Sequence, residues 1–307
     1  MGQDGKIKIE VYGLMKEAEF YMAKYVAEDL CSKNANLFMP PHCSAMLENQ
    51  WIRFLESTRN GEEKSSLGEL WSYKGNTLVL VNGEMIGTAE KFQEWATQQH
   101  EFHDHRPLPL YYAIAKEEYK DYLLKTQHDF IFLDIARGKD ERLGRVIVEL
   151  FSDKLPITCK NFKELCIGGK KETEKHDPPL ALQYKGSIFH RIVKNGWIQG
   201  GDIYHGKGDN GWSIYGETFS DEQYSVLHAH RGILGMANKG RHSNASQFYI
   251  TLQPAPWMDF KYVAFGEVVE GLDVLSALEE QETYNERPLQ ECKIRDCGVL
   301  DIENMFG

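Results

Sequence analysis

Polar and apolar residues follow two different spacings over the first third of the chain. Residues 6–12 alternate between polar and apolar side chains and predict a strand, whereas residues 16–33 repeat apolar side chains at helical spacing. A short apolar piece follows at 37–39, and Ser44 is a suitable N-cap for a helix to about residue 57. This stretch therefore predicts the order β-α-β-α.

A turn signal marks the clearest hairpin of this region. After a polar loop at 57–75, Asn82–Gly83 separates two short apolar runs at 77–81 and 84–86. This dipeptide favours the tight turns of β-hairpins. Thr88 then precedes an amphipathic helix as a candidate N-cap. Residues 1–99 therefore predict one α/β domain of order β-α-β-α-β-β-α.

Residues 100–127 are predicted to join this domain to the rest of the chain. Arg106–Pro109 is a stiff, extended step, and residues 111–125 are typical of an amphipathic helix that docks one domain on another. His100, His103 and His105 crowd into the same polar stretch. A zinc site needs about four ligands that converge tetrahedrally, so solvated side chains are the favoured interpretation and no metal is predicted.

The pattern changes to many short strands over residues 128–303. Six of the predicted strands lie at 130–136, 144–151, 189–193, 197–199, 262–268 and 292–299. Only two helices are predicted, one from Pro156 and one over 271–280, so we expect a closed antiparallel barrel capped at its ends. The long charged loop 168–183 is a candidate functional insertion. Residues 204–212 contain G-x-G without the strand-turn-helix context of a nucleotide site, so no cofactor is predicted.

Two polar side chains interrupt the apolar strands at 189–202. Arg191 lies on the first strand and Gln199 on the second, with a turn at Lys194–Gly196 between them. A lone arginine on an edge strand usually faces solvent, because arginine is rarely buried without a partner. The alternative is a polar groove, since Asn238 and Gln247 add amide side chains to apolar strands further on.

Six ordered motifs make residues 128–303 resemble the cyclophilins, which are peptidyl-prolyl cis-trans isomerases. They are FHRI (189–192), QGGD (199–202), SIYGETF (213–219), GMAN (235–238), SQFYIT (246–251) and FGEV (265–268). The resemblance is closest to a divergent type within that family. It implies an eight-stranded closed barrel and recognition of proline-containing protein segments without a cofactor.

The resemblance also implies a role for each matching residue. Arg191 would donate to the nitrogen of the twisted X-Pro amide, Gln199 would orient it, and Asn238 would bond the substrate backbone. The groove around them would be lined by apolar and amide side chains, namely Val193, Trp197, Ala237, Gln247, Tyr249, Trp257 and Tyr262.

Five positions depart from the family pattern. Gly196 replaces the aromatic residue that stacks on proline, Trp197 a methionine, Tyr262 a histidine and Lys239 an alanine, and Tyr249 stands where the family commonly has phenylalanine. Loss of an aromatic wall removes about 1.5–3 kcal/mol of apolar burial. Trp197 either replaces that wall or fills the emptied pocket, and the sequence leaves both open.

The first domain resembles thioredoxin-like and glutaredoxin-like folds by the order of its elements. The reactive cysteine of those enzymes stands at the N-terminus of the helix after the first strand, where this chain has Gly13–Lys16. No thiol-disulfide exchange is therefore expected. Cys31 and Cys43 are either core residues, as free cysteines usually are, or an alternative thiol pair.

Composition and charge limit the partners. The 307 residues carry a net charge of −11, which argues against nucleic-acid binding. No apolar run approaches the ~20 residues of a membrane span, and six cysteines without a C-x-x-C pair favour a reducing, cytoplasmic setting. The resemblance adds a cytoskeletal or ciliary setting, with tubulin or axonemal proteins as candidate partners.

Two classes of function are consistent with these patterns. The first is a peptidyl-prolyl isomerase whose activity is weakened by the pocket substitutions. The second is a non-catalytic structural component of a larger assembly, possible because both domains resemble enzymes that have lost reactive or binding residues.

Overall fold

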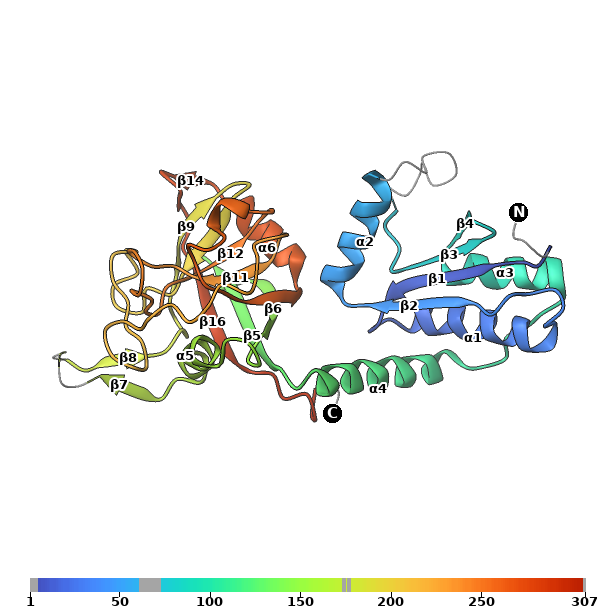
Figure 1. Cartoon of the computed structure of the whole chain (residues 1–307), viewed down its shortest axis with the longest axis horizontal. Coiled ribbons are helices and arrows are strands. Elements are labelled where there is room, and N and C mark those ends of the chain that lie inside the picture. Colours follow the sequence, from blue (N-terminus) through green and yellow to red (C-terminus); the bar gives the residue numbers. More distant parts are fainter. Residues whose placement is uncertain (1–4, 61–72, 173–174, 176–177, 306–307) are drawn as a thin grey trace. The chain divides into compact units, whose positions relative to one another are not determined.

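The structure is a computed structural model of the whole chain (Figure 1). It describes residues 5–60, 73–172, 175 and 178–305. The chain folds as two compact units, one up to Thr126 and the other over Gln127–Met305.

The first unit is a four-stranded mixed sheet with helices. Its sheet order is β2-β1-β3-β4, with β1 parallel to β2 and antiparallel to β3. The order of elements is the predicted one, and one further helix follows it. The second strand, however, lies at 42–46 and not at 37–39, where Phe38 forms only an isolated bridge with Ile7. The elements are β1 (Ile9–Leu14), α1 (Ala18–Lys33), β2 (His42–Met46), α2 (Glu48–Asn60), β3 (Thr77–Val81), β4 (Glu84–Gly87), α3 (Ala89–His100) and α4 (Leu108–Thr126).

Helices α1, α3 and α4 share one core with the sheet. Val11 and Val79 of the strands pack with Val26 of α1, Phe92 of α3 and Tyr111 of α4, all of them buried. The expected linker helix is thus part of the first unit, since Tyr111 and its neighbours complete this core.

One capping prediction in this unit was wrong, and a second was right in position only. Ser44 does not cap a helix: it lies in β2, opposite Tyr12 of β1, and α2 begins only at Glu48. Pairing with β1 overrides the local capping signal there. Thr88 occupies the N-cap position of α3 without a side-chain capping hydrogen bond. The loop expected at 57–75 lies mostly outside the described residues, and α2 extends into its first positions.

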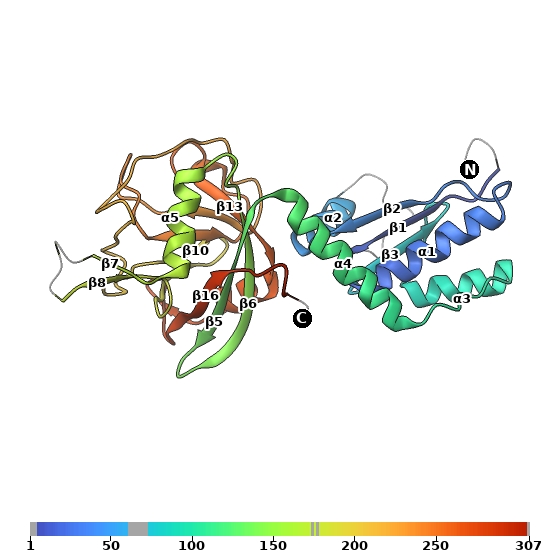
Figure 2. The same cartoon turned by 90° about the horizontal axis from the view of Figure 1, so that it is seen from below.

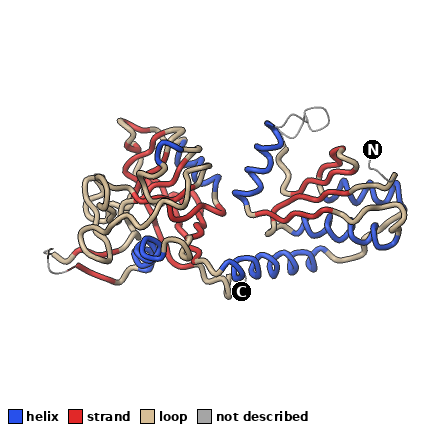
Figure 3. The backbone as a smooth tube through the Cα atoms, in the orientation of Figure 1, coloured by secondary structure: helices blue, strands red, loops and turns tan. Residues whose placement is uncertain are grey.

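The second unit is an eight-stranded antiparallel barrel, as predicted. Its strand order is β16-β5-β6-β13-β11-β12-β10-β9, and a bridge between Ile188 and Lys293 joins the two ends of the sheet. Figure 3 shows these strands in red, gathered in one body. They are β5 (Asp129–Arg137), β6 (Glu141–Leu150), β9 (Phe189–Val193), β10 (Trp197–Gly200), β11 (Ile233–Met236), β12 (Phe248–Thr251), β13 (Ala264–Glu270) and β16 (Cys292–Val299).

Two helices and a short 3₁₀ turn accompany the barrel within the described residues of this unit. They are α5 (Pro156–Ile167), α6 (Leu272–Glu279) and η2 (Pro256–Met258). Figure 2 shows α5 lying over the strands. Its fully buried Phe162 packs edge-on against Phe248 of β12, with ring centroids 5.2 Å apart, and tilts against Phe265 of β13 at 5.4 Å. Helix α5 therefore closes the apolar core of the barrel on this side.

Two short ladders lie outside the barrel. The charged insertion at 168–183 contains a small hairpin, β7 (Lys170–Glu172) with β8 (Leu180–Leu182), where a loop was expected; residues 173–174 and 176–177 are outside the described part. A second hairpin pairs β14 (Thr283–Tyr284) with β15 (Arg287–Pro288). Among the described helices, none is long and apolar enough to cross a bilayer.

Candidate functional site

The β9–β10 hairpin places the expected polar residues side by side. Arg191 stands directly opposite Gln199, and Val193 stands opposite Trp197. The Gly196 N–H donates to the Val193 carbonyl at 2.9 Å and closes the turn, with Asn195 at a φ of 55°. The two strands and the turn expected from the sequence are thus present, and the register adds which residues face each other.

Arg191 is held by a residue that the sequence reasoning missed. Its Nε donates to Glu286 Oε2 at 2.6 Å, and its guanidinium carbon lies 5.1 Å from the centre of the Trp197 ring. The expectation that Gln199 orients Arg191 is not what the structure shows, because the Gln199 amide is bound elsewhere. The sequence signal was Asn285–Glu286, a turn dipeptide with glutamate where glycine is usual.

The amide side chains form a connected polar network. Gln199 Nε2 donates to Gln247 Oε1 at 2.9 Å, and Gln247 Nε2 donates to the Asn210 carbonyl at 2.6 Å. Trp197 Nε1 donates to Gln199 Oε1 at 3.4 Å. Gln247 is 8% exposed, so its amide is fixed in place. The resulting row of amides suits contact with an extended peptide backbone.

A cavity of about 220 Å³ adjoins this network. Four expected residues line it, namely Gln199, Ala237, Asn238 and Gln247. Lys239 lines the cavity as well, and its side chain contacts the 204–212 segment: Lys239 Nζ donates to the Asp209 carbonyl at 2.6 Å. The lysine that replaces the usual alanine therefore adds a positive charge to this side of the groove.

The apolar half of the site is a separate small cluster. Tyr249, Ala255 and Met258 form its buried centre, and Trp197, Ala237 and Tyr262 pack against it. The Tyr262 ring meets the Tyr249 ring at 82°, with centroids 6.0 Å apart. Trp257 lies beside Met258 on η2 and is 50% exposed, as a residue at the rim would be.

Trp197 packs against the cluster that would hold a proline ring. Gly196 presents no side chain, and a Cβ atom there would lie only 2.9 Å from Val193 Cγ1. The aromatic wall expected from the family is therefore absent at residue 196, and Val193 occupies adjacent space. Trp197 supplies the only aromatic surface from the turn and strand 194–200, all of whose residues the structure describes.

Tyr249 carries a hydroxyl group into the floor of this cluster. Its hydroxyl lies 2.6 Å from His228 Nε2, and His228 Nδ1 lies 2.8 Å from Asp259 Oδ1. Gly235 makes room for it, because a Cβ atom at that position would lie 2.3 Å from the tyrosine oxygen. The sequence comparison of motifs did not reveal this chain of contacts, which joins four separate segments.

The protonation states follow from burial. Burial raises the pKa of Tyr249 well above its ordinary value and lowers the pKa of His228. Burial also opposes ionisation of Asp259, but hydrogen bonds from the His228 backbone and ring outweigh it and lower the pKa of that carboxyl. Tyr249 therefore donates to a neutral His228, which in turn donates to the Asp259 carboxylate.

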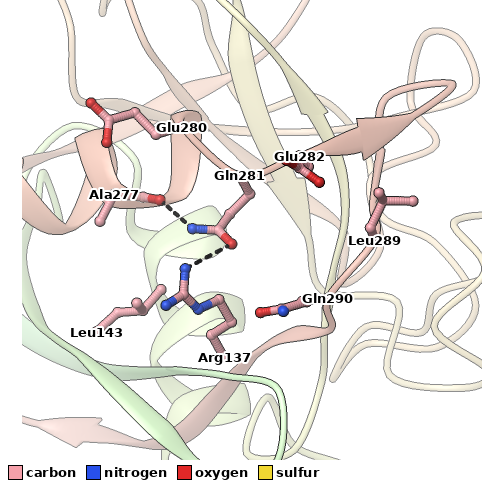
Figure 4. Close-up of a pocket in the computed structure, with 8 residues that line it drawn as sticks. All are labelled: Arg137, Leu143, Ala277, Glu280, Gln281, Glu282, Leu289 and Gln290. Atoms are coloured by element: carbon pink, nitrogen blue, oxygen red, sulfur yellow. Dashed lines mark hydrogen bonds between the residues drawn. The ribbon is translucent and has the colours of Figure 1, made fainter.

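A larger cavity of about 650 Å³ lies elsewhere on the same unit (Figure 4). It is lined by Arg137, Gln281, Glu282 and Leu289 among others. Gln281 accepts from Arg137 Nη1 at 3.3 Å and donates to the Ala277 carbonyl at 2.6 Å. None of the expected site residues lines it.

The first unit shows no reactive thiol at the expected place. Gly13 and Leu14 end β1, and Met15 and Lys16 lead towards α1. Cys31 and Cys43 pack against the core cluster of this unit. Burial raises the pKa of the Cys43 thiol to about 11, which disfavours the thiolate needed for exchange. Within the described residues, no group of three or more His, Cys, Asp or Glu side chains has metal-binding geometry.

Comparison with known proteins agrees with the barrel fold of the second unit. The family model of cyclophilin-type peptidyl-prolyl cis-trans isomerases matches residues 132–299. The chain is 46% identical over 293 residues to the human probable inactive peptidyl-prolyl cis-trans isomerase-like 6, covering 95% of this chain and 91% of that protein. It is also 46% identical to the bovine relative of the same name, covering 96% and 93%, and to the murine one, covering 96% and 91%. The chain therefore belongs to the cyclophilin-type peptidyl-prolyl isomerase family and is similar to its isomerase-like 6 members.

Proposed function

We propose that the barrel binds proline-containing protein segments and catalyses their cis-trans isomerisation slowly. The proposal rests on one observation above all: Arg191, Gln199 and Gln247 keep a polar row beside an apolar cluster from which the aromatic side chain at residue 196 is missing. The polar half of a cyclophilin-type groove is thus present, and the apolar half is altered.

The chemistry needs only a donor and a grip on the proline. An X-Pro bond crosses a barrier of about 18–20 kcal/mol, which comes from amide resonance. Twisting the bond localises a lone pair on the proline nitrogen, and a guanidinium that donates to that nitrogen stabilises the twisted state more than the planar one. Arg191 supplies the donor, and the amides of Gln199, Gln247 and Asn238 supply contacts for the peptide backbone.

The weak grip accounts for slow catalysis. An aromatic ring that stacks on proline contributes about 1.5–3 kcal/mol by apolar burial, which is about ten- to a hundredfold in affinity. Trp197 is the aromatic residue that the β9–β10 hairpin contributes beside the cluster, and it also bonds Gln199. The name of the relatives, probable inactive isomerases, agrees with low activity.

The test uses the full chain and the peptide succinyl-Ala-Ala-Pro-Phe-p-nitroanilide. Exchange spectroscopy by NMR measures the catalysed cis-trans rate, and a titration measures binding. We expect the chain to bind the peptide and to catalyse its isomerisation at a rate well below that of an ordinary cyclophilin. Arg191→Ala should remove this catalysed rate. A rate equal to that of an ordinary cyclophilin contradicts the weakened-site proposal, and absence of both binding and exchange contradicts the peptide-binding proposal.

A second candidate function is that of a structural component in an assembly. The specific observation that favours it is the first unit, whose fold order resembles redox proteins while Gly13–Lys16 lacks the reactive cysteine. Candidate partners are proteins of the cytoskeleton or cilium, such as tubulin, and the charged insertion at 168–183 is the proposed contact. Lys170 and Lys171 would face an acidic partner there, although the net charge of −11 opposes it.

Two variants separate these functions in cells. Arg191→Ala should abolish isomerisation and leave incorporation into an assembly intact, whereas replacement of residues 168–183 by a short Gly/Ser linker should weaken incorporation. If Arg191→Ala alone abolishes the cellular role, the structural proposal is wrong and the isomerase proposal stands.

A further inference from the structure

The tip of the β14–β15 hairpin reaches the arginine of the groove. Glu286 Oε2 accepts from Arg191 Nε at 2.6 Å, a short charge-assisted hydrogen bond. The two residues are 95 positions apart in the sequence. The bound guanidinium lies over Trp197, so the carboxylate fixes both the charge and the direction of the side chain.

The backbone at this tip has an unfavourable conformation at Glu286, which indicates that the side chain of this residue has a role. Asn285 and Glu286 both have positive φ, 48° and 66°, and they form the two-residue turn between the paired residues Tyr284 and Arg287. Such turns favour Asn-Gly, because glycine adopts positive φ without cost. A glutamate held there costs stability that a glycine would not. The feature that glycine lacks is the carboxylate.

Backbone and side-chain contacts anchor the tip against the groove. The Ile192 N–H donates to the Glu286 carbonyl at 2.6 Å, and Arg287 Nη2 donates to the Gly206 carbonyl at 2.9 Å. The hairpin is thus tied to strand β9 on one side and to the 204–212 segment on the other. These contacts fix the backbone that carries the Glu286 carboxylate beside Arg191.

This contact competes with the chemistry proposed for Arg191. A guanidinium that donates to a carboxylate is partly neutralised and has one donor fewer for a substrate nitrogen. Four of its five N–H groups remain, but the contact with Glu286 sets their direction, so a substrate nitrogen has to meet them in that orientation or shift them. The same contact keeps the cation stacked on Trp197 in the resting protein.

We propose that Glu286 is a positioning residue that holds Arg191 in a resting orientation and thereby slows isomerisation. The proposal rests on the proposed isomerase function and deepens it. An X-Pro segment displaces the carboxylate from the guanidinium as it binds. The slowness of the site therefore has two separable sources, the missing wall at Gly196 and the carboxylate at Glu286.

The expected size of the effect is modest because the pair is partly solvated. The side chains of Arg191 and Glu286 are 42% and 45% exposed. Ion pairs of this exposure contribute little to stability, because water screens them and both side chains lose freedom. Release of Arg191 is therefore expected to raise the isomerisation rate about two- to fivefold.

Three variants of the full chain test this with the same peptide, succinyl-Ala-Ala-Pro-Phe-p-nitroanilide. Glu286→Gln removes the charge and keeps the shape, while Glu286→Asp keeps the charge on a side chain one methylene shorter. Glu282→Gln is the matched control, since Glu282 lines the cavity of Figure 4 at the base of the same hairpin and carries the same charge. We expect both Glu286 variants to raise the rate about two- to fivefold, and the control to leave it unchanged.

A spectroscopic readout separates positioning from a general structural role. The Arg191 Nε–H signal in ¹H–¹⁵N spectra should shift in both Glu286 variants and stay in place in Glu282→Gln. Arg191→Ala combined with Glu286→Gln should lose the gain in rate.

The outcomes are distinguishable from those of the proposed function. If the wild-type chain binds and isomerises the peptide and Glu286→Gln is no faster, the role of Glu286 is refuted and the proposed function stands. If neither chain shows binding or exchange, both proposals fail. A rate that rises equally in Glu282→Gln refutes the role of Glu286, because charge alone would then explain the gain.

Discussion

The substitution Tyr249→Phe tests the interpretation of the pocket floor. It restores the phenylalanine common in the family and removes one oxygen atom. In this chain that oxygen is the partner of His228 Nε2 at 2.6 Å. The His228 side chain is 0% exposed, so water cannot replace the tyrosine. We therefore expect a change towards the family pattern to destabilise the barrel.

The magnitude follows from the group left without a partner. A hydrogen bond contributes about 0.5–1.5 kcal/mol net, whereas a buried polar atom deprived of its partner costs about 1–3 kcal/mol. His228 Nδ1 remains bound to Asp259, so only one ring nitrogen is orphaned. The expected loss is about 1–3 kcal/mol in the free energy of unfolding of the second unit.

Native-state hydrogen exchange gives the assay, because it reports the opening free energy of each element in a chain of two units. The opening free energy of the amides in β11 and β12 should fall by about 1–3 kcal/mol. The opening free energy of the amides in β1 and β3 of the first unit should not change. A double-mutant cycle with His228→Leu should give a coupling of about 1 kcal/mol or more, since the two side chains contact each other.

An unchanged or higher opening free energy in Tyr249→Phe would refute the reasoning. It would mean that the histidine finds another partner or that the hydroxyl contributes nothing. A loss that is equal in the presence and absence of His228 would show that packing, and not this hydrogen bond, sets the cost.

Three further predictions concern the same unit. Gly235→Ala should cost about 1–3 kcal/mol by the same exchange measurement, because its Cβ atom would lie 2.3 Å from the Tyr249 oxygen; an unchanged opening free energy would contradict the close approach. The barrel should lose stability as the pH falls below about 6.5, because burial lowers the pKa of His190 and His228 in the folded state and only the unfolded chain takes up those protons there; opening free energies that rise between pH 7 and pH 5.5 would contradict this. Gly196→Phe together with Val193→Ala should raise the isomerisation rate about tenfold or more, whereas Gly196→Phe alone should gain less, because a Cβ atom at residue 196 meets Val193 Cγ1 at 2.9 Å; equal rates in the single and double variants would show that Val193 is not the obstacle.

The sequence by itself determined the elements that depend on local patterns. Alternation of apolar residues and the turn at Lys194–Gly196 placed Arg191 and Gln199 on facing strands, as the register shows. The order of strands and helices in the first unit and the antiparallel barrel in the second were also predicted. These features are readable because strand and helix periodicity is written in neighbouring residues.

The strand β2 shows where local patterns fail. Ser44 has the chemistry of a helix cap, but it lies in a strand because pairing with Tyr12 of β1 satisfies its backbone groups. Capping preferences are worth about 1 kcal/mol. A full row of inter-strand hydrogen bonds and the packing behind it outweigh such a local preference.

The tertiary structure alone decided what surrounds the site residues. Glu286 reaches Arg191 from a hairpin 95 residues away, and Gln199 bonds Gln247 instead of orienting the arginine. Tyr249, His228 and Gly235 contact one another only because the barrel brings their segments together. A side chain's type can be read from the sequence, but its hydrogen-bond partner depends on which distant segments the fold brings within about 3 Å. Burial then makes the loss of that partner costly, because water cannot replace it.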